Sequence, residues 1–137
     1  MRIAFPIALS TLSLVVVCAP ACATNHVVVV GGTSFVYTPN SLTIQVGDTV
    51  TFTNDPVDGG GGFHNVHATS GPTLFQCSVT CSAGGNTPNG SAWKQTISFP
   101  TAGTVNFQCD QHAGLGMSGT ITVQGTVPVR LQSFEVD

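Results

Sequence analysis

Apolar and polar residues alternate through residues 42–53, and this period of two constrains the fold more than any other feature of the sequence. The apolar members of the pattern are Leu42, Ile44, Val46, Val50 and Phe52. Successive side chains of a strand point to opposite faces of a sheet, so the pattern predicts strands with one buried face. We expect these strands to form an antiparallel hairpin that turns at Gly47-Asp48.

Other segments also favour strands. They are residues 27–30, 65–69, 93–99, 104–109 and 118–124. The run at 27–30 is continuously apolar, which is typical of a strand buried on both sides or placed at the start of a sheet. In the 104–109 segment, Val105, Phe107 and Cys109 share one side, which places a thiol at the end of a row that faces the core. No window after residue 23 shows the helical period over the required length, so we expect an all-β domain.

A thiol, an imidazole and a thioether follow the last of these core-facing rows, as Cys109, His112 and Met117. Thiolate and thioether favour copper(I), and imidazole suits both oxidation states of copper. A second imidazole, His64, comes close only if a β-sandwich brings two end loops together. The alternative is structural, with Cys109 as a small buried residue and Met117 as core filling. That alternative does not explain why the four residue types coincide at this spacing.

Cys-x2-His-x4-Met with an upstream His-Asn-Val resembles the cupredoxins, and most closely their plastocyanin and pseudoazurin branch. The matching segments are 37–52, 64–66, 109–117 and 119–123. The resemblance implies a single-domain Greek-key β-sandwich that binds one type 1 copper ion. His64, Cys109 and His112 are then the equatorial ligands, and Met117 is the axial ligand. The resemblance also implies that the side chain of Asn65 forms hydrogen bonds between the two ligand loops.

The N-terminus is typical of an export signal. Arg2 precedes an apolar run at 3–17, and Ala21-Cys22-Ala23 has the small-x-small form of a cleavage site. We therefore expect a signal peptide at 1–23, a copper-binding domain at 24–124 and a C-terminal tail of unknown role at 125–137, in a periplasmic or secreted protein. Lipidation of Cys22 is an alternative. The apolar run is shorter than the roughly 20 residues that a membrane-spanning helix needs.

The chain has five cysteines. Cys18 and Cys22 leave with the expected signal, and Cys77 and Cys81 most simply close a small disulfide in the polar segment at 71–90. A second metal site at that pair is the alternative, although no neighbouring His or carboxylate completes it. Cys109 then remains a thiol in an oxidising compartment, which a bound copper ion explains.

Charged residues are sparse. The cations left after processing are Lys94 and Arg130, and the full chain has a formal net charge of −3. We therefore expect the protein to bind neither nucleic acid nor anionic membranes. We expect a monomer that docks transiently with redox proteins through apolar contacts.

The glycines at 59–62 indicate either a flexible connection or a loop that lies close to the metal and positions His64.

These residues favour a one-electron carrier. A copper-binding protein for sequestration or delivery is the alternative, although copper carriers often cluster Met and His residues and only Met117 remains after processing. We expect no enzymatic activity, because four histidines cannot supply a trinuclear copper site. His67 should point away from the copper ion and be a surface residue or have a redox-linked or weak second-metal role. We expect His26 to be solvated.

Overall fold

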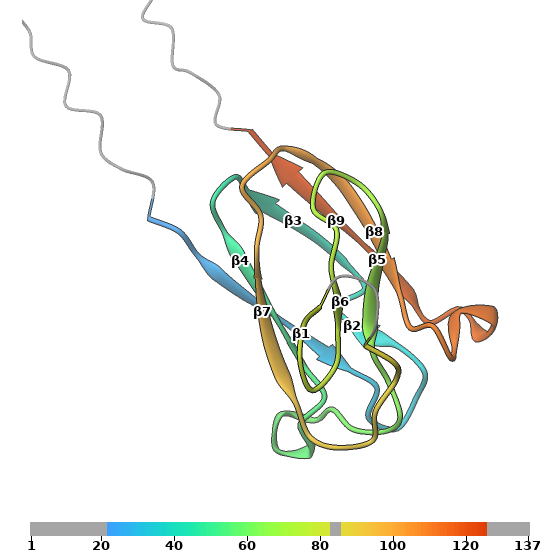
Figure 1. Ribbon diagram of the computed structural model, residues 1–137. Coiled ribbons are helices and arrows are strands. Elements are labelled where there is room, and N and C mark those ends of the chain that lie inside the picture. The colour runs from blue at the N-terminus through green and yellow to red at the C-terminus, as the bar shows by residue number, and fades with distance from the viewer. Residues whose placement is uncertain (1–21, 83–85, 126–137) are drawn as a thin grey trace, which may run out of the picture.

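A computed structural model describes residues 22–82 and 86–125, and nearly all of its regular elements are strands (Figure 1). The first sheet has the order β2 (Tyr37–Thr38), β1 (Asn25–Val30), β4 (Thr49–Thr53) and β7 (Lys94–Ser98). The second has the order β3 (Ser41–Gln45), β9 (Ser118–Gln124), β8 (Gly103–Gln108), β5 (Val66–Ser70) and β6 (Gln76–Cys77). Two 3₁₀ turns, η1 (Pro56–Asp58) and η2 (Ala113–Leu115), are the helical elements of the described residues.

The two sheets pack face to face around one apolar core. Phe52 of β4 meets Phe107 of β8 edge to face, with ring centroids 5.3 Å apart, and Tyr37 of β2 meets the same ring at 4.9 Å. Burying a side chain of this size contributes about 1.5–3 kcal/mol. The row Val105, Phe107 and Cys109 is buried as its alternation predicts. The expectation of an all-β sandwich is therefore confirmed.

The predicted hairpin over 42–53 is wrong. β3 pairs in parallel with β9, which places Ile44 opposite Val123, while β4 lies in the other sheet between β1 and β7. The turn at Gly47-Asp48 carries the chain from one sheet to the other, and the amide of Gly47 donates to the carbonyl of Phe99 at 2.9 Å. Each sheet consequently contains one parallel pair of strands. The alternation in sequence indicates that one face of a strand is buried, but it does not indicate which strand it pairs with.

The corner beside this turn also corrects two expectations about the N-terminal strand. His26 is only partly solvated, with 25% of its side chain exposed, because its Nε2 lies 2.9 Å from Asp48 Oδ2, while the amide of Thr24 donates to Asp48 Oδ1 at 2.8 Å. The backbone hydrogen bonds from Thr24 and Gln45, and then the contact with His26, lower the pKa of Asp48 to about 2. The run at 27–30 is not buried on both sides either, since Val27 is half exposed.

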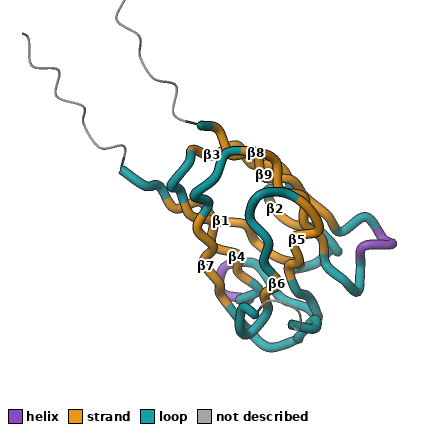
Figure 2. Tube along the Cα trace, turned by 45° about the horizontal axis from the view of Figure 1, so that its top comes forward, coloured by secondary structure: helices purple, strands orange, loops and turns teal. Residues whose placement is uncertain are grey.

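The elements that lead into the predicted ligands all point to one end of the sandwich. β1 ends next to Gly31, β4 runs toward the loop that carries His64, and β9 begins beside Met117. Both ends of the described chain, near residues 22 and 125, leave at the opposite end, as the two views show (Figures 1 and 2). The expected signal peptide and tail lie almost wholly outside the described residues. In the described part of the chain, no helix is long and apolar enough to cross a membrane.

Candidate metal centre

A compact loop carries three of the predicted ligands. The amide of Cys109, just past β8, donates to the carbonyl of Met117 at 3.0 Å, and the amide of Met117 donates to the carbonyl of His112 at 3.2 Å. Between them η2 forms a single turn that ends at Gly116, whose φ of 87° suits glycine. The loop therefore closes on itself at the strand ends, and Cys109 and Met117 are fully buried in it.

The fourth predicted ligand arrives from the glycine-rich loop after β4. Asn54, itself buried, organises this loop: its side-chain amide donates to the carbonyl of Gly62 at 2.9 Å, and its Oδ1 accepts from the amide of Gly61 at 3.2 Å. His64 then pairs through its backbone with Asn89 in both directions. Sequence reasoning missed Asn54, because a lone Asn before a proline-containing turn gives no signal of contacts made eight residues later.

Glycines make direct room for the His64 ring. A Cβ added at Gly62 would lie 2.7 Å from His64 Nε2, and one added at Gly31 would lie 2.5 Å from the same atom. Both glycines have positive φ, 104° and 74°. The outer edge of the ring is therefore packed against bare backbone and its Nδ1 faces the other ligands. Of the two interpretations of the glycine run, the one in which the loop lies close to the site is confirmed.

His64, Cys109 and His112 come together at the end of the sandwich, with their ligand atoms within 4.8 Å of one another. Cys109 Sγ lies 3.7 Å from His64 Nδ1 and 3.6 Å from His112 Nδ1, and the two nitrogens are 3.0 Å apart. The point equidistant from these three atoms is about 2 Å from each, close to the length of metal–nitrogen and metal–sulfur bonds in proteins. The three atoms therefore fit a single transition-metal ion.

Burial supports this use of the three residues. Their exposed fractions are 0% for Cys109, 2% for His64 and 9% for His112. Burial, and then the neighbouring His112, lower the pKa of His64. A neutral imidazole has a free lone pair, so His64 is prepared to bind a metal cation. Met117, the predicted axial residue, is joined to this set through the backbone hydrogen bonds of its own loop.

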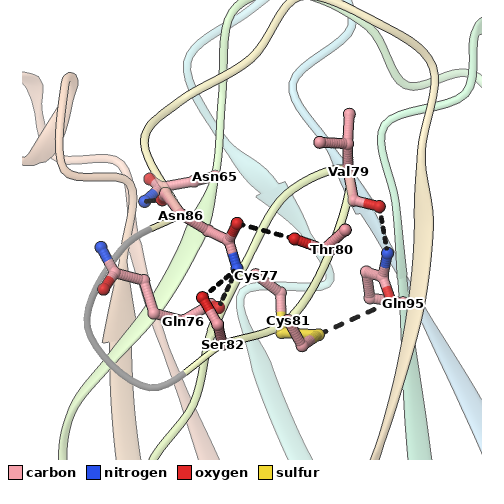
Figure 3. The surroundings of a disulfide bond; sticks show 9 residues. All are labelled: Asn65, Gln76, Cys77, Val79, Thr80, Cys81, Ser82, Asn86 and Gln95. Carbon is pink, nitrogen blue, oxygen red and sulfur yellow. Dashed lines mark hydrogen bonds between the residues drawn. A yellow bond between two sulfur atoms is a disulfide. The ribbon is translucent and has the colours of Figure 1, made fainter.

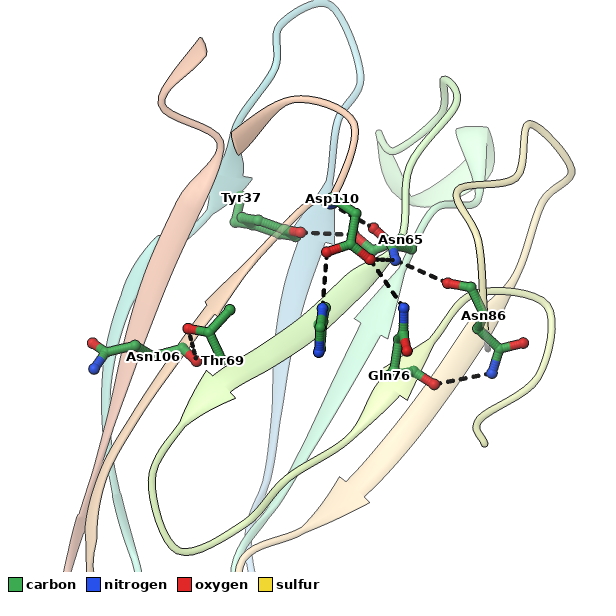
Figure 4. A network of polar contacts seen from close by, with 8 residues as sticks. Tyr37, Asn65, Thr69, Gln76, Asn86, Asn106 and Asp110 are labelled. Atoms are coloured by element: carbon green, nitrogen blue, oxygen red, sulfur yellow. Dashed lines mark hydrogen bonds and ion pairs between the residues drawn. The ribbon is translucent and has the colours of Figure 1, made fainter. Parts of the chain in front are cut away.

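A polar network supports the two ligand loops from behind (Figure 4). The side chain of Asn65 accepts from the amide of Asp110 at 2.9 Å and donates to the Asp110 carboxylate at 2.7 Å. Tyr37 donates its hydroxyl to the carbonyl of Asn65 at 2.7 Å. Burial, and then the charges of Cys109 and Asp110, raise the pKa of Tyr37, so its hydroxyl remains a donor. Neither Tyr37 nor Asp110 could be placed in this network from sequence, because both contacts join segments far apart along the chain.

An aromatic residue covers the outer side of the site. The ring of Phe35 stacks on the ring of His112, with centroids 4.2 Å apart and planes inclined by 15°. A pocket of about 430 Å³ lies between Phe35 and Phe63 and reaches both His64 and His112. Phe35, Phe63 and Leu115 are 49%, 54% and 66% exposed. The rim around the imidazoles is therefore apolar, and Phe35 reaches it from a loop that sequence reasoning did not connect with the site.

Cys77 and Cys81 form the expected disulfide in the polar segment at 71–90 (Figure 3). Cys77 is buried, and Asn86 holds the segment by donating to the carbonyl of Gln76 at 2.9 Å. Because the two sulfurs are bonded to each other, the alternative of a second metal site at this pair is wrong.

His67 lies apart from the three clustered ligands, and its Nδ1 contacts Asp110 at 2.8 Å.

Known proteins are similar to this chain in both sequence and fold. The plastocyanin of Scenedesmus fuscus is 34% identical over 92 residues, which cover 66% of this chain and 89% of the relative. The plastocyanin of Prochlorothrix hollandica is 33% identical over 120 residues, or 82% of each chain. Among solved structures, a Cu(I) form of an amicyanin mutant matches with a TM-score of 0.52 and 26% identity, covering 73% of this chain and 82% of that chain. A fern plastocyanin mutant matches in fold with a TM-score of 0.55 and 23% identity, covering 72% and 99%.

A family model described as copper binding proteins of the plastocyanin/azurin family matches residues 24–124, which is most of the chain. The match begins at the first residue before β1 and ends with the last residue of β9, so it takes in both sheets and both ligand loops. The chain belongs to the plastocyanin/azurin family of copper-binding proteins.

Proposed function

We propose that this protein is an exported type 1 copper protein that carries single electrons between redox partners. The observation that carries the proposal is the buried triangle of His64 Nδ1, Cys109 Sγ and His112 Nδ1, with sides of 3.0–3.7 Å. Two imidazoles and a thiolate with a weak axial thioether form the donor set of blue-copper sites. We therefore assign one copper ion, with His64, Cys109 and His112 as equatorial ligands and Met117 as the axial ligand.

Copper, when bound, supplies reversible one-electron chemistry. The residues of this chain hold the donor atoms in one arrangement. The backbone bonds that close the 109–117 loop fix Cys109 and His112, and the contacts of Gly31 and Gly62 fix the His64 ring. A donor set that does not rearrange between oxidation states favours fast electron transfer, and burial of Cys109 and Met117 excludes water from the site.

The apolar rim is the proposed docking surface. Phe35 stacks on His112, Phe63 lines the same pocket, and Leu115 is exposed on the ligand loop itself, so we assign the His112 edge as the way out for the electron. Lys94 is the sole lysine or arginine among the described residues, and it is paired with Asp55 and Asp58 at 3.5 and 3.0 Å. Charge therefore offers little steering, and small apolar contacts suit the transient encounters of redox proteins.

Export and the absence of enzymatic activity complete the proposal. The signal peptide predicted at 1–23 and the disulfide between Cys77 and Cys81 both suit an oxidising compartment, periplasmic or extracellular. The chain has four histidines, two of them in the triangle, whereas copper oxidases need further histidine ligands. We propose that the protein acts as a monomeric carrier with protein redox partners.

The optical spectrum of the purified mature protein with copper tests the proposal. We expect an intense blue colour that bleaches on reduction, and loss of this colour in Cys109→Ser. The double variant Cys77→Ser, Cys81→Ser is the matched control, because it also removes sulfur but leaves the triangle intact, and it should remain blue. A colourless copper-loaded wild type would refute the type 1 assignment. Fast transfer of the ion to a chelator, with slow electron exchange, would favour copper delivery instead.

A further inference from the structure

Asp110 is the centre of the polar network behind the ligand loops. It directly follows Cys109, and its carboxylate accepts hydrogen bonds from Asn65 at 2.7 Å, from His67 at 2.8 Å and from Gln76 at 3.0 Å. Its own amide donates to Asn65 at 2.9 Å. In Figure 4 dashed lines join the carboxylate to the side chains of Asn65 and Gln76. One side chain thus joins the Cys109 loop to the residue after His64, to β5 and to β6.

The ionisation state of the Asp110 side chain determines the strength of these hydrogen bonds. An ionised carboxylate accepts hydrogen bonds at both oxygens, and hydrogen bonds to an ionised group are about twice as strong as neutral ones. Aspartate carboxylates are ordinarily ionised at neutral pH, and both oxygens of Asp110 accept hydrogen bonds here. Asp110 is therefore anionic at neutral pH.

A fixed negative charge beside the thiolate ligand also affects the reduction potential of a metal bound there. The side chain of Asp110 is only 32% exposed, so water screens its charge incompletely. Within residues 22–82 and 86–125, the one lysine, Lys94, is committed to Asp55 and Asp58 and leaves Asp110 without a lysine or arginine partner. The three donors from Asn65, His67 and Gln76 are thus the groups that moderate this charge.

We propose that Asp110 is a positioning residue that locks the two ligand loops together and lowers the reduction potential of the copper centre. The proposal rests on the proposed copper site. A negative charge stabilises the more positive, oxidised state of the centre relative to the reduced state, which lowers the potential. The hydrogen-bond donors on β5 and β6 moderate the field of that charge, so removing one donor strengthens the field.

Two substitutions with opposite expected signs test this. Asp110→Asn keeps the size of the side chain and removes its charge, so the reduction potential should rise. The expected rise corresponds to about a tenfold decrease in the ratio of Cu(II) affinity to Cu(I) affinity. Gln76→Leu removes one donor and leaves the charge, so the potential should fall. The matched control is Asp58→Asn, which makes the same charge change at a carboxylate already paired with Lys94 and should move the potential much less.

A second measurement needs no copper. Hydrogen exchange of the apoprotein over residues 109–117 should be faster in Asp110→Asn than in Asp58→Asn, because the lock between the two loops is weakened. Equal potentials in the wild type and in Asp110→Asn would overturn the proposal, as would a rise in both Asp110→Asn and Gln76→Leu, which would indicate general loosening. A wild type that is not blue would instead refute the proposed function, so the two failures are distinguishable.

Discussion

Substituting Gly62 with alanine should damage the copper site beyond the cost of backbone strain alone. Gly62 has a φ of 104°, and its new Cβ would lie 2.7 Å from His64 Nε2. A residue other than glycine in such a conformation costs about 1–3 kcal/mol. Forcing an added carbon against a packed ring costs about a further 1–3 kcal/mol. Part of that second cost is relieved if the His64 ring moves, and movement of the ring spoils the triangle.

Gly59→Ala provides the matched control within the same loop. Gly59 has a φ of 89°, and a Cβ placed there meets no atom within 4 Å. It should carry the strain cost without the collision. We therefore expect the apoprotein of Gly62→Ala to be less stable than that of Gly59→Ala by up to about 3 kcal/mol, which is the collision cost with no relief from ring movement.

Two measurements separate the parts of this prediction. Urea unfolding of both apoproteins gives the difference in the free energy of unfolding, and a copper titration followed in the visible spectrum reports the site. Gly59→Ala should turn blue with nearly wild-type affinity, whereas Gly62→Ala should bind copper more weakly or give a weaker colour. If the two variants matched each other in both stability and colour, the inference that Gly62 positions the His64 ring would be wrong.

Three further outcomes follow from the site and the fold. Met117→Leu should keep the protein blue and raise its reduction potential, and Met117→Gln should lower it; equal potentials by voltammetry would show that Met117 is not the axial ligand. The folded-state pKa of Asp48 is depressed to about 2, so its contribution to stability is present above the unfolded pKa near 3.8 and is lost as pH falls between these values. The free energy of unfolding of Asp48→Asn should therefore depend less on pH across that window than that of the wild type, and an unchanged dependence on pH would contradict this. Under non-reducing, denaturing conditions the mature apoprotein should show one titratable thiol, Cys109, and a count of three would refute the pairing of Cys77 with Cys81.

The local pattern of the sequence predicted the strands better than their pairing. The strands expected at 104–109 and 118–124 match β8 and β9 to within a residue, because alternation reports burial of one face directly. The hairpin prediction at 42–53 failed because β3 and β4 lie in different sheets, and each pairs with strands distant in the sequence, as Ile44 pairs with Val123. A short turn looks the same in sequence whether it reverses a strand or crosses between sheets.

The residues of the metal centre divide in a similar way. Cys109, His112 and Met117 could be grouped from sequence because one short loop carries them, and the resemblance to cupredoxins added His64. Phe35 and Asp110 could not be assigned, because their roles depend on contacts between loops that only the folded sandwich brings together. An isolated Phe or Asp has no spacing that distinguishes such a contact from an ordinary surface position.

The placement of residues 22 and 125 opposite the metal centre affects how the protein can be tethered. A lipid, a fused domain or an electrode linker joined near residue 22 or residue 125 would hold the molecule by the far end of the sandwich. The stacked pair of Phe35 and His112 would then face outward, away from the supporting surface. An immobilised molecule could therefore still meet freely diffusing partners, and both ends offer attachment points that keep the redox face clear.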